Sequence, residues 1–240
     1  MNIGNFEIGA GKTFIIAETC SNIIPHLYNL GGVVAAVAST GADALKVQLY
    51  LADHFPEAER ASKKRTEFPR DLFPKLVELC HEKGLACGAS VFDEEAIRIV
   101  KESGGDFLKL ATREWENDDL LRSTYQTHLP TIRSFDMNRL GNLARYWVTG
   151  PMIAYLSCWP EYPTGGNRPI IILDDNKGHF EGWSSHTEHW IDCIVAAARH
   201  TSILEKHIKF LANDYEAGWS LYPNEFQQMV KDIRWMEEAR

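Results

Sequence analysis

A regular alternation of short apolar runs and longer amphipathic stretches constrains the fold of this chain more than any other feature. Short runs rich in β-branched residues predict buried strands, and apolar residues three and four apart predict helices. The expected strands number eight and cover residues 14–18, 44–48, 85–90, 106–112, 130–134, 151–157, 179–185 and 201–207. This order favours parallel strands joined by helical crossovers.

Expected helices occupy the intervals between these strands. They cover residues 29–40, 71–84, 93–105, 115–124, 137–147, 187–199 and 223–239, with 168–176 as a degraded helix and 51–68 as a polar loop. Eight strand–helix pairs in about 230 residues are typical of a TIM barrel. We therefore predict an α/β fold in which residues 1–240 form a single TIM (β/α)8 barrel domain and residues 1–13 a short N-terminal cap.

Composition and net charge limit the classes of binding partner and the cellular compartment that suit this chain. The net charge of −8 argues against a nucleic-acid surface, which needs clustered Lys and Arg. The one basic cluster, Lys63-Lys64-Arg65, is interpreted as a solvated loop that could still meet an anionic substrate. No apolar run approaches the length of a membrane span. The five cysteines form no CxxC pair and fit free thiols, so we expect a cytoplasmic protein without nucleic-acid or membrane partners.

Polar residues gather at the ends of the expected strands, where a TIM barrel carries its active site. Lysines and small hydroxyls can hold a phosphate and a carboxylate, a glutamate can transfer a proton, and two imidazoles can hold a divalent metal. The strand-end residues that support these functions are Glu18, Lys46, Gln48, Ser90, Lys109, Thr112, Ser134, Ser184, His186 and His207. Alternation along a strand also places Glu205 on the same face as His207.

Several segments then resemble the sialic acid synthase family in order along nearly the whole chain. They are FIIAE (14–18), GADALKVQLY (41–50), EFPRDLFPKLVELC (67–80), FDEEA (92–96), EYPT (161–164), SSHT (184–187), ILEKHI (203–208) and SLYPNEFQQMVKDIR (220–234). The resemblance implies condensation of phosphoenolpyruvate with an aldehyde or sugar acceptor, with release of phosphate and a 2-keto acid as product. His186 and His207 stand 21 residues apart, a spacing similar to that of the family's paired metal histidines.

The resemblance also implies roles for individual residues. His186 and His207 would hold Mn2+ or Mg2+, and Glu18 and Glu216 would be the catalytic acids. The substrate-binding residues would be Lys46, Gln48, Ser90, Lys109, Thr112, Ser134, Tyr162 and Ser184.

Departures from the family's pattern concern the acceptor. Pro160 stands where the family has a substrate-binding Asn, and Ser185 stands where it has an Asp beside a metal histidine. The sequence ends at Arg240, whereas the family usually continues into a small antifreeze-like domain. We therefore expect an altered acceptor, and a homo-oligomer or a partner that supplies the missing part.

Two other functions remain open from the sequence. The chain could be a catalytically reduced barrel that serves as a binding or assembly subunit. It could also be a Schiff-base aldolase that uses Lys109 or Lys206 as its nucleophile.

Overall fold

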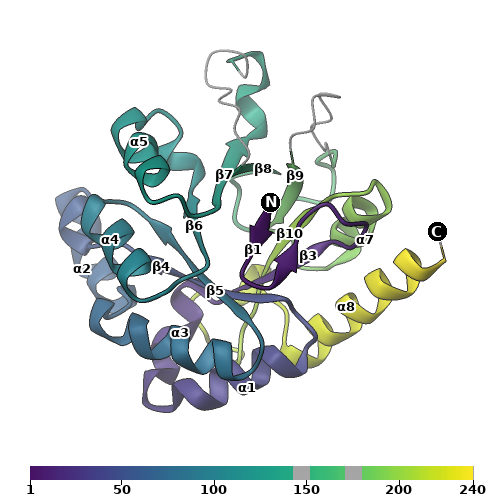
Figure 1. Ribbon diagram of the computed structural model, residues 1–240, viewed down its shortest axis with the longest axis horizontal. Coiled ribbons are helices and arrows are strands. Elements are labelled where there is room, and N and C mark those ends of the chain that lie inside the picture. Colours follow the sequence, from purple (N-terminus) through teal and green to yellow (C-terminus); the bar gives the residue numbers. More distant parts are fainter. Residues whose placement is uncertain (143–151, 171–179, 240) are drawn as a thin grey trace.

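Eight parallel strands close into a barrel in the order β10-β3-β4-β5-β6-β7-β8-β9 (Figure 1). The computed structural model describes residues 1–142, 152–170 and 180–239. The strands are β3 (Phe14–Glu18), β4 (Ala44–Leu49), β5 (Ala86–Val91), β6 (Phe107–Leu110), β7 (Thr131–Asp136), β8 (Ile153–Cys158), β9 (Phe180–Ser185) and β10 (Ile203–His207). The predicted TIM barrel is thus confirmed.

The N-terminal cap is a short antiparallel hairpin. Its strands are β1 (Asn2–Ile3) and β2 (Phe6–Glu7). Ile3 is buried against the lower barrel interior together with Phe14 and Phe107, whose rings meet edge to face at 6.4 Å. The hairpin therefore closes the end of the barrel at which the strands begin.

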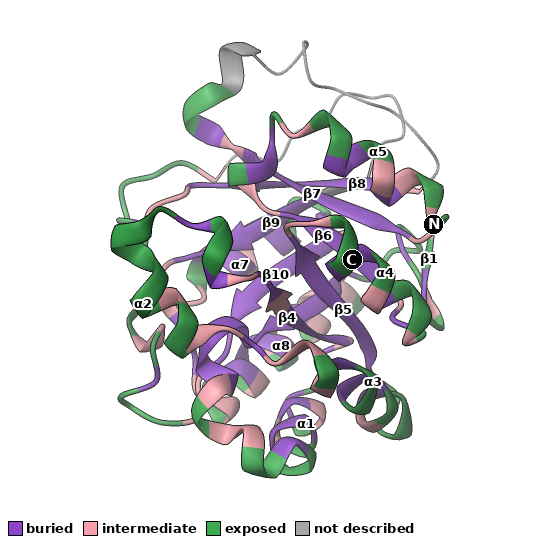
Figure 2. Cartoon of the chain, turned by 90° about the vertical axis from the view of Figure 1, so that its left-hand side faces the viewer, coloured by how far each residue is buried: buried purple, intermediate pink, exposed green. Residues whose placement is uncertain are grey.

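Helices surround the barrel and cover the outward side chains of its strands (Figure 2). Asp93 and Asn117 each cap the helix that follows, because their side chains accept a hydrogen bond from a backbone amide of the first turn. The α-helices in this layer are α1 (Leu30–Ser39), α3 (Phe73–Glu82), α4 (Glu94–Glu102), α5 (Asp118–Gln126), α7 (Ile191–Ala198) and α8 (Pro223–Glu238).

The predicted loop at 51–68 was wrong, because it contains the helix α2 (Glu57–Thr66) after a short 3-10 helix, η2 (Ala52–His54). None of the α2 residues is buried, so the helix has no apolar stripe that periodicity could reveal. Acidic residues in its first turn and basic residues in its last turn stabilise it through the helix dipole instead.

Two expected helices extend beyond the described residues. The segment predicted as helix at 137–147 begins with a 3-10 helix, η5 (Met137–Asn142), and its remainder lies outside the described residues. The degraded helix at 168–176 likewise falls mostly outside them. A further 3-10 helix, η1 (Cys20–Asn29), follows β3 and leads into α1.

Barrel interior and helix layer form two separate hydrophobic clusters. Alternate strand residues, such as Phe14 and Ile16, fill the barrel interior near the amino ends of the strands, whereas their neighbours, such as Ile15, pack against the helices. Gly88 makes room for Phe107, because a Cβ atom at Gly88 would lie 2.5 Å from that ring. Above this apolar layer, the inward positions near the strand ends are polar and buried.

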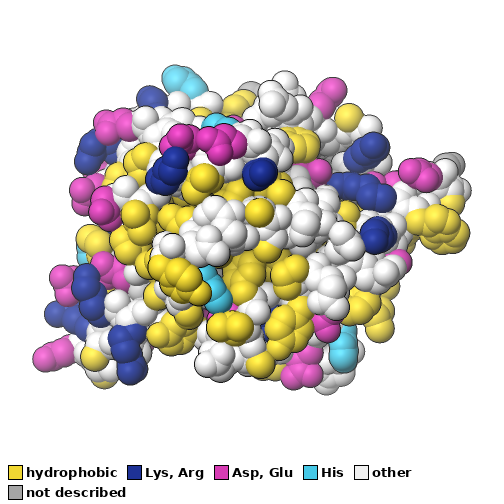
Figure 3. Space-filling model, turned by 90° about the horizontal axis from the view of Figure 1, so that it is seen from below, with side chains coloured by type: hydrophobic (Ala, Val, Ile, Leu, Met, Phe, Trp, Pro, Cys, Tyr) yellow, Lys and Arg dark blue, Asp and Glu magenta, His cyan; other side chains and the backbone are white. Residues whose placement is uncertain are grey.

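The face seen in Figure 3 has hydrophobic side chains at its middle and charged side chains around its edge. Residues 23–40, which form most of η1 and all of α1, contain no Asp, Glu, Lys or Arg. Among the helices that the structure describes, none has the length and apolar character needed to cross a membrane.

Candidate functional site

A cavity of about 460 Å³ opens at the carboxyl ends of the barrel strands. It brings together most of the residues that the sequence singled out. Those that line it are Glu18, Gln48, Ser90, Lys109, Thr112, Ser134, Tyr162, His186, His207 and Glu216. Lys46 and Ser184 lie directly beneath, in contact with residues of the lining.

Strand register explains why residues so distant in sequence meet here. Glu18 on β3 is paired with Lys46 on β4 and with His207 on β10. Ser90 on β5 is paired with Lys109 on β6 in the same way. Paired positions on neighbouring parallel strands point to the same side of the sheet. These side chains therefore form rings around the inside of the barrel mouth.

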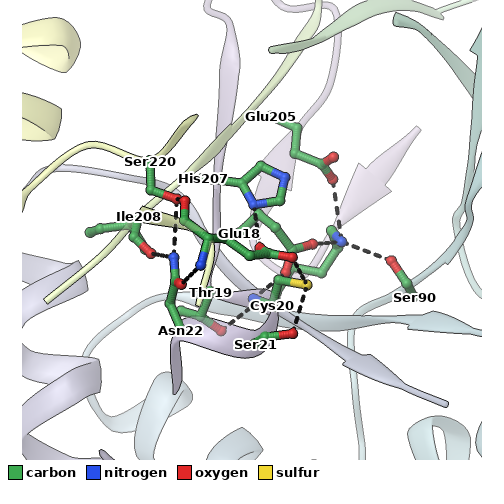
Figure 4. A network of polar contacts seen from close by, with 12 residues as sticks. Glu18, Thr19, Cys20, Ser21, Asn22, Ser90, Glu205, His207, Ile208 and Ser220 are labelled. Atoms are coloured by element: carbon green, nitrogen blue, oxygen red, sulfur yellow. Dashed lines mark hydrogen bonds and ion pairs between the residues drawn. The ribbon is translucent and has the colours of Figure 1, made fainter. Parts of the chain in front are cut away.

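Two buried lysines and two buried glutamates form the floor of the cavity. Lys46 Nζ is in contact with Glu18 and lies 3.4 Å from Glu205 Oε2. Lys109 Nζ lies 2.5 Å from Glu205 Oε1, so the Glu205 carboxylate is an ion-pair partner of both lysines. Figure 4 shows the dashed contacts that join Glu205 and Ser90 through the Lys46 ammonium group.

The floor residues carry strongly shifted pKa values. Burial lowers the pKa of the Lys46 ammonium to about 7, even though the neighbouring Glu205 carboxylate raises it. Burial alone would raise the pKa of Glu205, but the Lys109 and Lys46 ammonium groups outweigh it and hold that pKa well below its usual range. Glu205 therefore stays ionised near neutral pH.

The hydroxyl groups of the floor divide into engaged and available ones. Ser90 Oγ accepts a hydrogen bond from Lys46 Nζ at 2.8 Å, and Ser184 Oγ donates to Glu205 at 2.8 Å. Ser134 Oγ is buried and has no hydrogen-bond partner among the described residues, although Ser134 lines the cavity. A buried hydroxyl without a partner is the kind of group that a bound ligand satisfies.

His186 and His207 lie side by side at one wall of the cavity, with ring centroids 5.3 Å apart. His186 Nδ1 lies 3.0 Å from the carbonyl oxygen of Trp159, and His207 Nδ1 lies 2.9 Å from Glu216 Oε2. Both oxygens accept, so each Nδ1 carries the hydrogen, and a ring in its neutral form keeps a lone pair on Nε2. Burial, with the His207 ring next in effect, lowers the pKa of His186 to about 3.

This pair fits a divalent metal, because metal-binding histidines commonly donate their other ring nitrogen to a carbonyl or a carboxylate. Within residues 1–142, 152–170 and 180–239, no group of three or more His, Cys, Asp and Glu side chains has the geometry of a metal site. The protein would therefore supply two imidazoles and leave the other positions to water or substrate.

The turn after β3 fixes the carboxylate that orients His207. Cys20 has a positive φ of 38°, a conformation that is unusual for a residue other than glycine. Its thiol donates to Glu216 Oε1 at 3.0 Å, and its amide donates to Glu18 Oε1 at 2.6 Å. Cys20 thus links the two glutamates that the sequence identified as candidate acids.

Aromatic residues form the outer wall beside the histidines. The Tyr162 ring lies 4.3 Å from the His186 ring, centroid to centroid, and 5.4 Å from Trp219. Tyr162 is 51% exposed, so its ring borders the opening of the cavity. Pro160 also lines this side and offers no side-chain hydrogen bond.

Two residues weighed from the sequence lie on the other side of the sheet. Lys206 Nζ donates to Ser185 Oγ at 3.0 Å and to the carbonyl oxygen of Thr187. Neither Lys206 nor Ser185 lines the cavity. Lys206 is therefore not placed to act as a Schiff-base lysine in this cavity. The carboxylate expected at Ser185 would likewise have faced the helix layer rather than the histidines.

Glu205 is the functional candidate that sequence reasoning missed. Alternation along β10 placed it on the inner face with His207, but no role followed from that. Its two lysine partners come from other strands, and one of them is 96 residues away in sequence. An inward-facing acid two residues before a candidate metal ligand was the available signal.

Several known proteins are similar to this chain. The pseudaminic acid synthase of Campylobacter jejuni (serotype O:2) is 24% identical, over 100% of this chain and 78% of that protein. The spore coat polysaccharide biosynthesis protein SpsE of Bacillus subtilis is 25% identical, over 97% of this chain and 70% of that protein. The N-acetylneuraminate-9-phosphate synthase of Mus musculus is 23% identical, over 98% and 73%.

A solved structure shares the fold closely. The N-acetylneuraminic acid (sialic acid) synthetase of Leptospira borgpetersenii superposes with a TM-score of 0.88 at 24% identity, covering 100% of this chain and 89% of that chain. The model of the NeuB family matches residues 33–240. With most of its length matched, the chain belongs to the NeuB family, as its resemblance to sialic acid synthases predicted.

Proposed function

We propose that this protein condenses phosphoenolpyruvate with the aldehyde of a sugar-like acceptor, with the help of a divalent metal. The observation that carries the proposal is a single cavity in which the buried Lys46–Glu205–Lys109 cluster lies beside the His186–His207 pair. The first group suits an anionic donor, and the second suits a metal. The names of the relatives, which are synthases of sialic and related acids, support the same reaction.

The donor would occupy the floor. Phosphoenolpyruvate carries a phosphate and a carboxylate, and lysines with short hydroxyls are suitable partners for both. Lys46 and Lys109 supply the charge, and the Ser134 hydroxyl is available for a hydrogen bond. Gln48 and Thr112 line the same cavity, and Ser184 fixes the Glu205 carboxylate from below.

His186 and His207 would hold Mn2+ or Mg2+, which when bound would polarise the carbonyl oxygen of the acceptor. The Trp159 carbonyl and Glu216 hold the two imidazoles in the required orientation. Glu18, which is buried against Lys46, is the group that we assign to proton transfer.

The reaction balances with water as the only further reactant. The terminal carbon of the enol forms a bond to the aldehyde carbon, whose oxygen takes up a proton. Water adds to the neighbouring carbon, phosphate leaves from it, and that carbon becomes the ketone of a 2-keto acid. Pro160 lacks the side-chain donor that the family's pattern has at this position, so we propose an acceptor that differs from the relatives' sugars. We further propose that the protein acts in the cytoplasm, as a homo-oligomer or with a partner chain.

Two substitutions test this function. Lys46→Ala should weaken phosphoenolpyruvate binding more than about tenfold, because a charge-assisted contact contributes about 1.5–3 kcal/mol. His207→Ala should abolish Mn2+ binding and any phosphate release from phosphoenolpyruvate with a panel of aldehydes. Titration calorimetry with phosphoenolpyruvate and with Mn2+ measures both, and a phosphate assay measures turnover.

Matched controls are available on the surface. Lys101→Ala and His189→Ala remove the same side-chain types at exposed positions. They should change neither the dissociation constant for phosphoenolpyruvate nor that for Mn2+. If Lys46→Ala bound phosphoenolpyruvate like the parent, the donor assignment would be wrong. An unchanged Mn2+ titration of His207→Ala would overturn the metal assignment.

A further inference from the structure

A second pair of cations lines the outer part of the same cavity. Lys63 comes from α2, and Arg113 follows β6 in a short 3-10 helix, η4 (Thr112–Glu114). Both lie against one aromatic ring. Lys63 Nζ is 4.7 Å and Arg113 Cζ is 4.2 Å from the centroid of Phe55. Arg113 also lies 5.2 Å from the Phe92 ring.

These cations have no full set of carboxylate partners. Arg113 Nε donates to Glu114 at 3.0 Å, but its two terminal nitrogens have no hydrogen bond to any residue that the structure describes. Lys63 forms no ion pair within the same part of the chain. An aromatic face stabilises a cation but leaves its charge available to a ligand.

The other acids of the cavity cannot neutralise this pair, because they already have partners. Glu18 and Glu205 contact the floor lysines, and Glu216 contacts His207 and Cys20. Of the side-chain nitrogens of Arg113, Glu114 contacts only Nε. Within the described residues, the outer part of the cavity therefore keeps the charge of Lys63 and the two unbonded terminal nitrogens of Arg113 available to a ligand. A polar ligand with negative charge is the natural complement.

The segment between β4 and α3 builds this feature specifically. Phe55 directly follows η2 and is only 8% exposed, packed edge to face on Tyr50 with ring centroids 5.3 Å apart. Of the three basic residues at the end of α2, Lys63 lines the cavity, whereas Lys64 pairs with Glu67 outside it. The orientation of Lys63 is thus a property of the site rather than of a generally charged surface.

We propose that Lys63 and Arg113 bind a phosphate monoester on the acceptor, so that the acceptor is a phosphorylated aldose. This inference rests on the function proposed above. The Lys63 ammonium and the unbonded terminal nitrogens of Arg113 offer more donors and charge than a singly charged carboxylate needs, and they suit the nearly doubly charged phosphate monoester. The guanidinium fork can hold two phosphate oxygens, and the ammonium group adds a point charge.

Binding of matched sugars tests the proposal on the full chain. The probes are D-mannose 6-phosphate with D-mannose, and D-arabinose 5-phosphate with D-arabinose, titrated in the presence and absence of phosphoenolpyruvate and Mn2+. The parent should bind each phosphorylated sugar more than about tenfold more tightly than its neutral form, as expected for charge-assisted contacts. The double variant Lys63→Gln, Arg113→Gln should lose this preference.

Control variants distinguish the outer pair, Lys63 and Arg113 (the rim), from the lysines of the cavity floor. The double variant Lys64→Gln, Arg65→Gln removes two neighbouring charges outside the cavity lining and should keep the preference. The Lys63 and Arg113 variants should keep the parent's affinity for phosphoenolpyruvate. A loss of phosphoenolpyruvate affinity in them, with sugar phosphate binding intact, would assign the pair to the donor and overturn the proposal.

Three other results would also overturn it. They are equal binding of phosphorylated and neutral sugars by the parent, a preference that survives in the double variant, and equal affinity for D-mannuronate and D-mannose 6-phosphate. Failure of the proposed function gives a different result, because phosphoenolpyruvate would then not bind the parent. Sugar phosphate binding measured without phosphoenolpyruvate would still report on Lys63 and Arg113.

Discussion

The floor and the rim of the cavity each carry two cations, but the floor cations are buried with carboxylate partners and the rim cations lie near solvent. Lys46 and Lys109 are buried and share the carboxylates of Glu18 and Glu205. Lys63 and Arg113 lie near solvent on an aromatic ring, largely without carboxylates. A charge in a dry interior needs a partner before any ligand arrives, whereas a charge near water does not.

The comparison separates stability from specificity. Changing a floor charge leaves its partner buried and unpaired, and this lowers the free energy of unfolding of the whole protein. Changing a rim charge affects mainly the ligand that meets it. The rim is therefore where a barrel of this kind can acquire a new acceptor without losing its fold.

The largest expected effect is on the floor. Glu205→Gln removes the carboxylate shared by Lys46 and Lys109, and should lower the free energy of unfolding by about 3–5 kcal/mol, the usual cost of breaking a buried ion pair. Urea unfolding measures it. Adding Lys109→Met to Glu205→Gln removes one stranded charge and should restore part of the loss. A loss below about 1 kcal/mol would contradict the view that the floor depends on Glu205.

The next effect concerns pH and the neutral, buried His186. Its pKa of about 3 lies below the 6.5 of the unfolded chain, so the unfolded chain binds more protons between these values. The free energy of unfolding should therefore fall as the pH drops from 6.5 toward 3. Relative to His186→Gln, the parent should lose about 1.4 kcal/mol per pH unit in this window. Urea unfolding at pH 6, 5 and 4 measures the difference, and parallel curves would refute it.

The smallest effect is expected at the rim. Lys63→Gln and Arg113→Gln should each change the free energy of unfolding by no more than about 0.5 kcal/mol, because both side chains lie near solvent. Thermal and urea unfolding measure the change. If either substitution destabilised the protein as much as Glu205→Gln does, the contrast between rim and floor would be false.

Much of the fold could be predicted because periodicity reports local geometry. The eight strands appeared as β-branched runs, and each lies within a few residues of its predicted range. The helix α2 was missed for the same reason, since it buries no residue and has no apolar stripe. Lys63 was consequently assigned to a solvated loop, although it borders the cavity.

The sequence by itself determined which side chains face the barrel interior, because successive residues of a strand point to opposite sides. Alternation alone placed Lys46 with Gln48, and Glu205 with His207. Only the tertiary structure decided which of them meet. Lys109 on β6 and Glu205 on β10 are four strands apart in the closed order, on opposite sides of the barrel, yet their charged groups lie 2.5 Å apart. Barrel closure and strand register set that contact, and no local pattern records them.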